Sequence, residues 1–383
     1  MSKSFDVVIA GGGPAGLCAA RVLARQGREI LVLDRAVFPR PKLCGGLLTH
    51  KTMGILERAF GLDVPAMEAA DLIDTASRDY SIHHRGRLLL KGRAAHPFRL
   101  VRRERLDAHL LRLAREAGAE VREGAAVIGC DPETGTTDLA DGTSVTGRFL
   151  LGADGANSAV RRAVAPGRAA RTAWNRNLAA AIEIAVPRES APLSTDHPRL
   201  DVGLLRTGYG WVFPNRENLI IGICGLRHKS ERFAGIFRNY LRLLGFPEDF
   251  SPELHGHPLP YGNWLADPAR GRVLLAGDAG GFVEPLLGEG IFYALYTGFL
   301  AAGAIARALE DNAHPAEVYR RHLRGAVLPE LIWSNRLRWM LFTGQRLFGG
   351  PPIRAFHALS PGKLAEMVHG TRSFRLLAPK NWD

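Results

Sequence analysis

Apolar residues near the start of the chain alternate between continuous runs and a helical pattern. Residues 5–10 (FDVVIA) and 29–34 (EILVLD) are short apolar runs, which are typical of buried strands. Between them, three glycines turn the chain and Pro14 stands where a helix can begin, so we expect a helix to about Gln26. A strand, a helix and a second strand in this order predict two parallel strands of one sheet.

Later parts of the chain carry the same two periods. Residues 100–117 place leucines at helical spacing, and residues 120–150 alternate through short β runs with a turn at Asp141-Gly142. Region 166–264 is rich in predicted strands, and another buried strand follows it. The apolar runs that predict these strands are 178–186 (LAAAIEIAV), 208–214 (GYGWVFP), 218–226 (NLIIGICGL) and 272–276 (RVLLA).

The longest uncharged run covers residues 290–306 (GIFYALYTGFLAAGAIA). Its length is at the lower limit of the roughly 17 to 25 residues that span a bilayer. Because Glu284 and Glu289 precede it closely, we expect a buried helix rather than a membrane span. After about residue 311 we expect helices, interrupted at 349–352 (GGPP).

Composition narrows the classes of function. The 383 residues carry 50 basic against 38 acidic side chains but no compact basic cluster with interleaved aromatic residues, so we expect no nucleic-acid partner. The positive charge instead favours acidic lipid surfaces or diphosphate-bearing substrates. The four cysteines lack metal-ligand spacing, which predicts reduced thiols and no metal site. No signal-peptide pattern is present, so we expect a cytoplasmic protein.

The first turn carries a nucleotide-binding pattern. Gly11, Gly13 and Gly16 have the spacing G-x-G-x-x-G, and Asp34 ends the second strand. Such glycines let the backbone approach a pyrophosphate at the helix N-terminus, and the acidic residue accepts hydrogen bonds from ribose hydroxyls. In this strand, turn and helix context, the pattern predicts a dinucleotide site.

Two further pairs of glycine and aspartate follow predicted strands. Asp154-Gly155 precedes a helix that we expect to begin near Ser158, and Gly277-Asp278 follows the last predicted strand. Asp154 has two interpretations, a residue that caps the helix or a part of the same ligand site. Together with the first turn, these pairs resemble the flavin-binding pattern of the para-hydroxybenzoate hydroxylase-like FAD enzymes.

Within that superfamily, three segments look most like the geranylgeranyl reductase family: PKLCGGLL (41–48), GYGWVFP (208–214) and GDAGGFVEPLLGEGIFYAL (277–295). The resemblance covers about residues 3–310. It implies a mixed α/β fold, in which a Rossmann-type FAD-binding domain carries an inserted antiparallel β-sheet substrate domain and C-terminal helices. The implied boundaries are 1–70, 98–165 and 265–310 for the FAD-binding domain, 71–97 and 166–264 for the substrate domain, and 311–383 for the C-terminal helical segment.

The resemblance also implies how the cofactor, FAD, is held. It gives Arg103 a contact with the cofactor and Asp278 a hydrogen bond to the ribityl chain. The helix that opens at Gly288–Gly290 would turn its N-terminal amides toward the pyrimidine edge of the flavin. The residues expected to bind FAD are Gly11, Gly13, Ala15, Gly16, Asp34, Arg35, Cys44, Gly45, Gly46, Arg103, Asp154, Gly155, Gly277, Asp278, Gly288, Gly290 and Ile291.

An aromatic face and one cysteine are the candidates for chemistry. Strand periodicity puts Tyr209, Trp211 and Phe213 on one face, where they form either an apolar wall beside the flavin or ordinary core packing. The resemblance runs Cys44 past the flavin ring, where its thiol could donate a proton, shape the pocket or tune the flavin. The alternative is a small buried hydrophobe. The predicted catalytic residues are Cys44, Tyr209 and Trp211, and the cysteines expected only to pack are Cys18, Cys130 and Cys224.

The predicted function is an FAD-dependent reductase that saturates carbon–carbon double bonds of a geranylgeranyl or polyprenyl group on a lipid or pigment. The alternatives are an FAD-dependent hydroxylase or halogenase on the same scaffold, or a flavoprotein that passes electrons to a quinone or a protein partner. Halogenases resemble WxWxIP where this chain has Tyr209 and Phe213, and the chain lacks a cysteine cluster for an iron–sulfur centre.

The expected partners are a prenyl-lipid substrate and an electron donor, which is either NAD(P)H or a ferredoxin-like protein. Only one G-x-G-x-x-G is present, so no second domain is dedicated to NAD(P)H. Residues 330–348 (ELIWSNRLRWMLFTGQRLF) mix tryptophan and phenylalanine with arginine, a composition suited to a lipid interface. We expect this segment either to make peripheral contact with the inner membrane face or to close the substrate tunnel.

Overall fold

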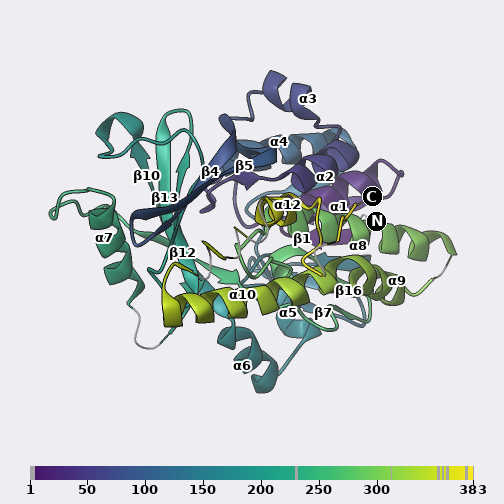
Figure 1. Cartoon of the computed structure of the whole chain (residues 1–383). Coiled ribbons are helices and arrows are strands. Elements are labelled where there is room, and N and C mark those ends of the chain that lie inside the picture. The colour runs from purple at the N-terminus through teal and green to yellow at the C-terminus, as the bar shows by residue number, and fades with distance from the viewer. Residues whose placement is uncertain are drawn as a thin grey trace.

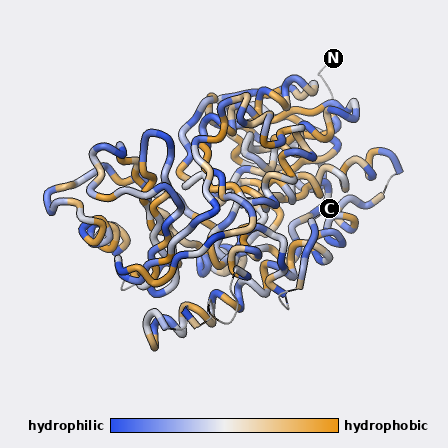
Figure 2. Tube along the Cα trace, turned by 45° about the horizontal axis from the view of Figure 1, so that its top comes forward, coloured by the Kyte–Doolittle hydropathy of each residue, from blue (hydrophilic) through white to orange (hydrophobic). Residues whose placement is uncertain are grey.

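Two eight-stranded sheets organise the part of the chain that the computed structural model describes (Figure 1). This part comprises residues 5–228, 232–311, 313–351, 354–355, 358, 362–375 and 378–382. Figure 2 shows that hydrophilic residues mark the outer loops, whereas hydrophobic residues gather along the inner strands and helices.

The first sheet is built around β1 (Phe5–Ala10), a short apolar strand that is almost entirely buried. β1 pairs in parallel with β2 (Ile30–Leu33) on one side and with β9 (Ser144–Gly152) on the other. The strand order is β15-β16-β9-β1-β2-β6, and the hairpin of β7 and β8 joins it through β9. The other strands of this sheet are β6 (Glu120–Arg122), β7 (Val127–Asp131), β8 (Thr136–Leu139), β15 (Ala269–Arg270) and β16 (Val273–Leu275). Because β1, β2 and β9 are parallel and in register, the turns that follow them meet at one edge of the sheet.

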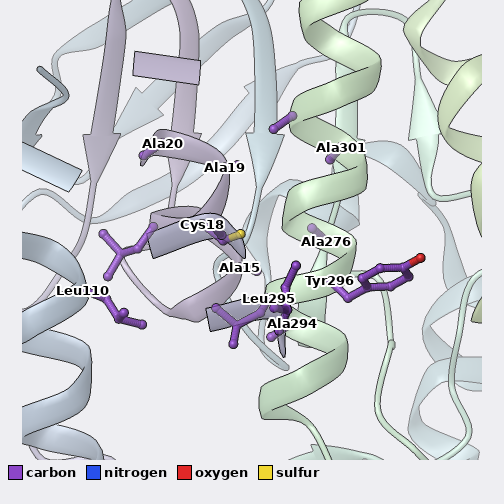
Figure 3. Packing of buried hydrophobic residues seen from close by; sticks show 14 of the residues in the cluster. Ala15, Cys18, Ala19, Ala20, Leu110, Ala276, Ala294, Leu295, Tyr296 and Ala301 are labelled. Carbon is purple, nitrogen blue, oxygen red and sulfur yellow. The ribbon is translucent and has the colours of Figure 1, made fainter. Parts of the chain in front are cut away.

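Three helices cover one face of the first sheet (Figure 3). Helix α1 (Pro14–Ala24) lies between α4 (Arg103–Glu116) and α8 (Ile291–Asp311). The crossing of α1 and α8 is very close, because a Cβ added at Gly298 would overlap the carbonyl oxygen of Ala15. The small residues of both helices permit this approach. The close crossing then fixes the position of the turn before α1 relative to the turn before α8.

Helix α8 is long and apolar enough to cross a membrane, but 78% of its apolar window is buried inside the protein. It packs on α1, on α2 (His50–Phe60) and on α9 (Pro315–His322). The prediction of a buried helix is therefore confirmed, and the helix extends beyond the predicted run, to Asp311.

The second sheet has the strand order β14-β10-β13-β12-β11-β4-β5-β3. Its neighbours pair antiparallel except β11 and β4, which are parallel. Its strands are β3 (Leu47–Leu48), β4 (Thr75–His84), β5 (Arg87–Leu100), β10 (Leu178–Pro187), β11 (Arg199–Val202), β12 (Gly208–Pro214), β13 (Asn218–Leu226) and β14 (His255–Pro260).

The two faces of the second sheet bury different clusters. One face packs on α7 (Phe233–Leu243), which contributes Phe237 and Tyr240 to that cluster. The other face carries Tyr80, Ala181 and the aromatic residues of β12, and α12 (Lys363–His369) packs against it. The remaining helices are α3 (Val64–Ala69), α5 (Ala159–Val164), α6 (Arg168–Arg176) and α10 (Leu328–Phe348), with 3-10 turns at Arg188–Ser190 and Gly277–Ala279 and a π-helical turn at Leu323–Val327.

The predicted mixed α/β fold class is confirmed. Strands β12 and β13 have the predicted bounds. The helix expected from residue 100 begins at Arg103 instead, because residues 87–100 form β5 and pair with β4. This long β4–β5 hairpin was not predicted, since its strands mix exposed and buried positions without a regular alternation.

Candidate active site

One cavity of about 890 Å³ brings the sequence-predicted site residues together. It runs from the edge of the first sheet, where β1, β2 and β9 end, to the inner face of the second sheet. Of the predicted residues, Gly16 alone is not part of the described lining; a Cβ there would overlap the carbonyl oxygen of Gly11, so it serves the tight turn. The predicted residues that line the cavity are Gly11, Gly13, Ala15, Asp34, Arg35, Cys44, Gly45, Gly46, Arg103, Asp154, Gly155, Tyr209, Trp211, Gly277, Asp278, Gly288, Gly290 and Ile291.

The first glycine turn passes close to the end of β9. Gly11 has a φ of +105°, and a Cβ there would overlap the carbonyl oxygen of Ala153. Gly13 then precedes Pro14, the first residue of α1. The backbone N–H groups in the first turn of a helix have no partner within the helix, so this end of α1 can bind an anion.

Asp34 links the end of β2 to this turn. Its Oδ2 accepts a hydrogen bond from the Gly12 N–H at 2.6 Å, and its Oδ1 accepts one from the Ala36 N–H at 2.8 Å. Each carboxylate oxygen keeps a second lone pair, so Asp34 can still accept from ribose hydroxyls while it fixes the turn.

Asp154 caps a helix and also lines the cavity. Its Oδ2 accepts hydrogen bonds from the N–H groups of Ala159, at 2.7 Å, and Val160, at 3.3 Å, and so caps α5. Its Oδ1 is buried and has no hydrogen-bond partner among the described residues, and Asp154 lines the cavity. Burial raises the pKa of this carboxyl group. An unpaired buried oxygen at the cavity is a place for a ligand hydroxyl.

Arg103 is held by a buried bidentate ion pair. Its Nε and Nη2 each lie 2.9 Å from an oxygen of Asp107, whose side chain is fully buried. Arg40 lies 3.5 Å from the same carboxylate. Burial alone would lower the pKa of Arg103. The nearby Asp107 and, after it, Cys44 raise this pKa by more than burial lowers it, so the net shift is upward. The guanidinium is therefore a fixed positive charge at the cavity.

Residues 42–46, here called the Cys44 segment, lie between the first-sheet edge and the second sheet. The Cys44 N–H donates to Glu183 Oε1 at 3.1 Å, and Lys42 Nζ lies 2.7 Å from His257 Nε2. A Cβ added at Gly45 would lie 2.6 Å from the Phe213 ring. Only glycine fits there, so the chain lies flat against the second sheet, and the half-buried Cys44 lines the cavity.

Burial shifts the titratable groups around the Cys44 segment. It lowers the pKa of Lys42, and burial with the nearby Lys42 charge lowers the pKa of His257 to about 4. Burial raises the pKa of Asp278 and raises that of Glu183 to about 7. At neutral pH, His257 is therefore an uncharged acceptor for the Lys42 ammonium group.

The predicted aromatic face is present on β12. The ring centroids of Tyr209 and Trp211 are 6.1 Å apart, and those of Trp211 and Phe213 are 6.3 Å apart. All three rings are buried and line the cavity, so they are both core residues and cavity wall. The Tyr209 hydroxyl donates to the Leu287 carbonyl oxygen, which ties the wall to the loop before α8.

That loop is held from several sides. The buried Glu284 accepts hydrogen bonds from the N–H groups of Leu286 and Leu287, both at 2.7 Å, and from the Ser334 hydroxyl of α10. The Tyr261 hydroxyl donates to the Leu286 carbonyl oxygen at 2.5 Å. The turn at residues 288–290 and the N-terminus of α8 are therefore fixed relative to the cavity.

Glu289 ties the same turn to α2. Its Oε2 lies 2.6 Å from Lys51 Nζ, and its Oε1 accepts from the Thr49 hydroxyl at 2.7 Å. The side chain of Lys51 is only 2% exposed. Its ammonium group also lies over the Phe292 and Tyr293 rings.

Beyond the Cys44 segment the cavity becomes an apolar chamber, lined by residues that include Ile82, Phe98, Ala181, Leu200, Leu364 and Val368. Sequence reasoning missed Leu364 and Val368, because α12 gives no motif that would connect it to the site. It also missed Glu183, although this is the lone charged residue in the apolar run 178–186. Cys18 and Cys224 are buried as expected, but Cys224 also lines the cavity.

Comparison with known proteins identifies the class. Residues 4–196 match the FAD binding domain family. The menaquinone reductase of Mycolicibacterium smegmatis is 34% identical over 327 residues, which cover 79% of this chain and 76% of the relative. The geranylgeranyl diphosphate reductase of Rhodobacter capsulatus is 30% identical over 325 residues, which cover 82% of this chain and 78% of the relative. The protein is thus an FAD-dependent oxidoreductase.

Solved structures share the fold. A geranylgeranyl bacteriochlorophyll reductase-like protein from Thermoplasma acidophilum has a TM-score of 0.76 at 19% identity, covering 98% of this chain and 94% of its own. A probable FAD-dependent monooxygenase from Pseudomonas aeruginosa has a TM-score of 0.66 at 21% identity, covering 91% and 99%. At these identities the likeness shows the fold alone. The sequence relatives show the family: the chain belongs to the geranylgeranyl reductase family of FAD-dependent oxidoreductases.

The cavity fits FAD, the cofactor of this family. A Cβ added at Gly13 would have the end of the Arg40 side chain, at 3.9 Å, as its nearest described neighbour. A Cβ added at Gly155 would have no described neighbour within 4 Å, so a ligand can lie against both turns. The unpaired Asp154 oxygen, the anion-binding end of α1 and the fixed charge of Arg103 supply polar partners along one path. We expect the pyrophosphate at the Gly11–Gly13 turn and the flavin between Asp278 and the Cys44 segment.

Proposed function

We propose that the protein reduces carbon–carbon double bonds of a geranylgeranyl or other polyprenyl group on a lipid or pigment. The observation that carries this proposal is the continuity of one cavity, in which the apolar chamber opens onto the Cys44 segment and the expected FAD site. An isoprenoid chain is long and uncharged, so its burial in such a chamber is favourable. The relatives named menaquinone reductase and geranylgeranyl diphosphate reductase support the same substrate class.

Alignment is the main task of the protein in this reaction. When bound, reduced FAD supplies a hydride to one alkene carbon, and the other carbon must receive a proton. Because an isolated alkene is a poor hydride acceptor, positioning must supply much of the rate, on the order of 7 to 11 kcal/mol for well-aligned reactants. Trp211 and Phe213 form the wall that orients the chain and excludes water, and Cys44 and Lys42 are proton-bearing groups beside it.

The loop before α8 has a separate task. The N-terminal amides of α8, from Ile291 onward, stabilise negative charge at the edge of the cofactor. Glu284, Glu289 and the Tyr209 hydroxyl hold this end of the helix in place. Electrons reach the site from NAD(P)H or from a ferredoxin-like protein.

The chamber supports a reductase over a hydroxylase or halogenase. Of the second-sheet residues that form the described lining, only His257 has a side chain of a type that commonly ionises near neutral pH. Burial and the nearby Lys42 lower its pKa to about 4, so it is uncharged there. A small aromatic acid or phenol would find few polar partners on this wall. An extended apolar chain needs none.

Helix α10 supports peripheral membrane contact. Its exposed side carries Ile332, Trp339, Met340 and Leu347 at helical spacing, and Phe348 is exposed at the C-terminal end of the helix. Exposed large apolar side chains gathered in this way mark an interaction surface. The opposite face buries Phe342 in a cluster with Leu286 and Met367, so the helix also closes the protein over the chamber side.

The function is tested with FAD-loaded protein that is reduced by dithionite under anaerobic conditions. Geranylgeranyl diphosphate and menaquinone are offered separately, and products are followed by mass spectrometry. We expect products heavier by successive pairs of hydrogen atoms. A parallel assay admits oxygen, and oxygenated or halogenated products there would mean that the protein is a hydroxylase or halogenase. Oxidation of FAD by a quinone, without a change in the mass of the prenyl chain, would indicate electron transfer alone.

A further inference from the structure

Glu183 of β10 contacts the Cys44 segment from behind. Its Oε1 accepts the hydrogen bond from the Cys44 N–H, and its Oε2 is enclosed without a hydrogen-bond partner in the described part of the chain. Cys44 lines the cavity, whereas Glu183 lies outside the described lining. The hydrogen bond to Cys44 thus connects Glu183 to the described cavity through a lining residue.

We propose that Glu183 is a positioning residue, which fixes the Cys44 backbone and so sets where the Cys44 thiol lies in the cavity. The part that concerns catalysis rests on the proposed function, since it takes Cys44 to work beside FAD. The hydrogen bond itself is a property of the chain and can be measured without any prenyl substrate.

Close contacts and backbone pairing hold the C-terminal end of the segment. A Cβ at Gly45 would lie 2.6 Å from Phe213 and 3.3 Å from the Trp211 Nε1, and a Cβ at Gly46 would overlap the Val101 carbonyl oxygen. These contacts define a narrow slot that fixes the distance of the segment from the sheet. The Gly46 carbonyl oxygen also accepts a hydrogen bond from the Val101 N–H at 2.9 Å, and Leu47 and Leu48 of β3 pair with β5.

Two further hydrogen-bonding contacts hold the part of the segment that carries the thiol. One joins Cys44 to Glu183 on β10, and the other joins Lys42 to His257 on β14. The two strands are neighbours, with Ala181 opposite His257, so both contacts come from one patch of the sheet. Glu183 is the contact that acts on Cys44 itself.

The Cys44 contact should depend on pH. Burial raises the pKa of Glu183 to about 7, against smaller opposing effects of the Cys44 N–H, Trp211, Lys42 and Arg103. The exposed His255 lies opposite Glu183 on β14. Because a carboxylate accepts a stronger hydrogen bond than a carboxylic acid, protection of the Cys44 amide from hydrogen exchange should rise as pH increases through about 7.

The test compares Glu183→Gln, which keeps an acceptor of the same size, with Glu183→Ala, which removes it. Glu189→Ala, at an exposed position just after the same strand, is the control. In FAD-loaded protein, we expect the Cys44 amide of Glu183→Ala to exchange about tenfold faster or more and iodoacetamide to modify Cys44 faster. FAD should stay bound, while prenyl reduction falls about tenfold in kcat. Glu183→Gln should stay within about threefold of wild type in exchange and turnover but lose the pH-dependent change in protection.

Several outcomes would overturn the proposal. Exchange at Cys44 that is unchanged in Glu183→Ala, or a Glu183→Gln variant as impaired as Glu183→Ala, would show that the acceptor does not position the segment. If Glu183→Ala does not fold, the wild-type protein is measured instead. A Cys44 amide that is not protected from hydrogen exchange in wild type would also show that Glu183 does not position the segment. If exchange behaves as expected but no prenyl chain is reduced by wild type, the proposed function fails and the positioning of Cys44 stands.

Discussion

Gly298 in α8 faces the carbonyl oxygen of Ala15 in α1 so closely that no side chain fits between them. The two helices begin at the two turns that line the expected FAD site, so their crossing sets the distance between these turns. A Cβ added at Gly277 would also lie 3.1 Å from Ala15 and 3.3 Å from Ala294. Three separate parts of the chain are thus packed to contact distance around the end of α1.

The substitution Gly298→Ala should push α8 away from α1. We expect a loss of about 1 to 3 kcal/mol in the free energy of unfolding, as for overpacked cores, and weaker FAD binding. Urea unfolding and FAD titration of the apoprotein measure the two effects.

Gly303→Ala is the matched control on the same helix. Among the residues that the structure describes, no atom outside the neighbouring residues and the helix's own backbone lies within 4 Å of a Cβ added at Gly303. Here the change should be neutral or stabilise by up to about 1 kcal/mol, because alanine favours a helix over glycine. Equal effects of the two substitutions would mean that the close crossing does not control the site.

The buried ion pair of Lys51 and Glu289 gives a second prediction. Lys51→Met should leave Glu289 as an uncompensated charge and cost about 3 to 5 kcal/mol in the free energy of unfolding. The double change Lys51→Met with Glu289→Gln should recover most of this loss, because both charges are then removed. Chemical denaturation of the single and double variants forms a complete cycle, and strictly additive losses would contradict the pairing.

Cys44→Ser tests the role of the thiol. Serine keeps a hydrogen-bond donor and nearly the same size but lacks the acidity of a thiol. FAD binding and folding should therefore be retained, while the proposed prenyl reduction slows about tenfold or more. Absorption spectra report bound FAD, and product mass reports turnover. Cys130→Ser, at a half-buried position outside the described cavity lining, should change neither quantity. Full activity of Cys44→Ser would leave Lys42 as the next proton donor to examine.

The fold and the cofactor could be predicted because their signals are local. The glycine turn, Asp34 and the apolar strands each follow from a short stretch of sequence, and parallel pairing then brings their ends together. The contacts of Glu183 with Cys44 and of α12 with the chamber join residues more than a hundred positions apart. No periodicity in one sequence reveals such pairings.

Tyr209 shows the same limit on a smaller scale. Strand alternation correctly predicts that it shares a face with Trp211, and the structure puts both rings on the cavity. The bond from its hydroxyl to Leu287 depends on a loop 78 positions away. With that bond formed, the hydroxyl is committed to the loop, so the prediction that Tyr209 is a catalytic residue stays a prediction, which Tyr209→Phe can test.

The outer face of α10 leads to the last prediction. Trp339 is 57% exposed, Phe348 is 69% exposed at the end of the helix, and Arg336 and Arg346 lie on the exposed side of α10. Residues 331–348 contain no acidic residue, so this face suits the surface of an anionic bilayer. We expect the protein to float with anionic liposomes at low salt and less so at high salt, because the charge attraction is screened.

Two variants separate the apolar and the electrostatic parts of this contact. Trp339→Ser with Phe348→Ser should reduce flotation at every salt concentration, since buried apolar area is lost. Arg336→Gln with Arg346→Gln should reduce it mainly at low salt, by about 1 kcal/mol for each arginine. Leu243→Ser, at an exposed position on α7, is the control and should float like wild type. If the Trp339 and Phe348 variant floats like wild type, these side chains do not bind the membrane. If the variant instead abolishes a dimer that wild type forms without lipid, this part of α10 is an interface between two copies of the chain.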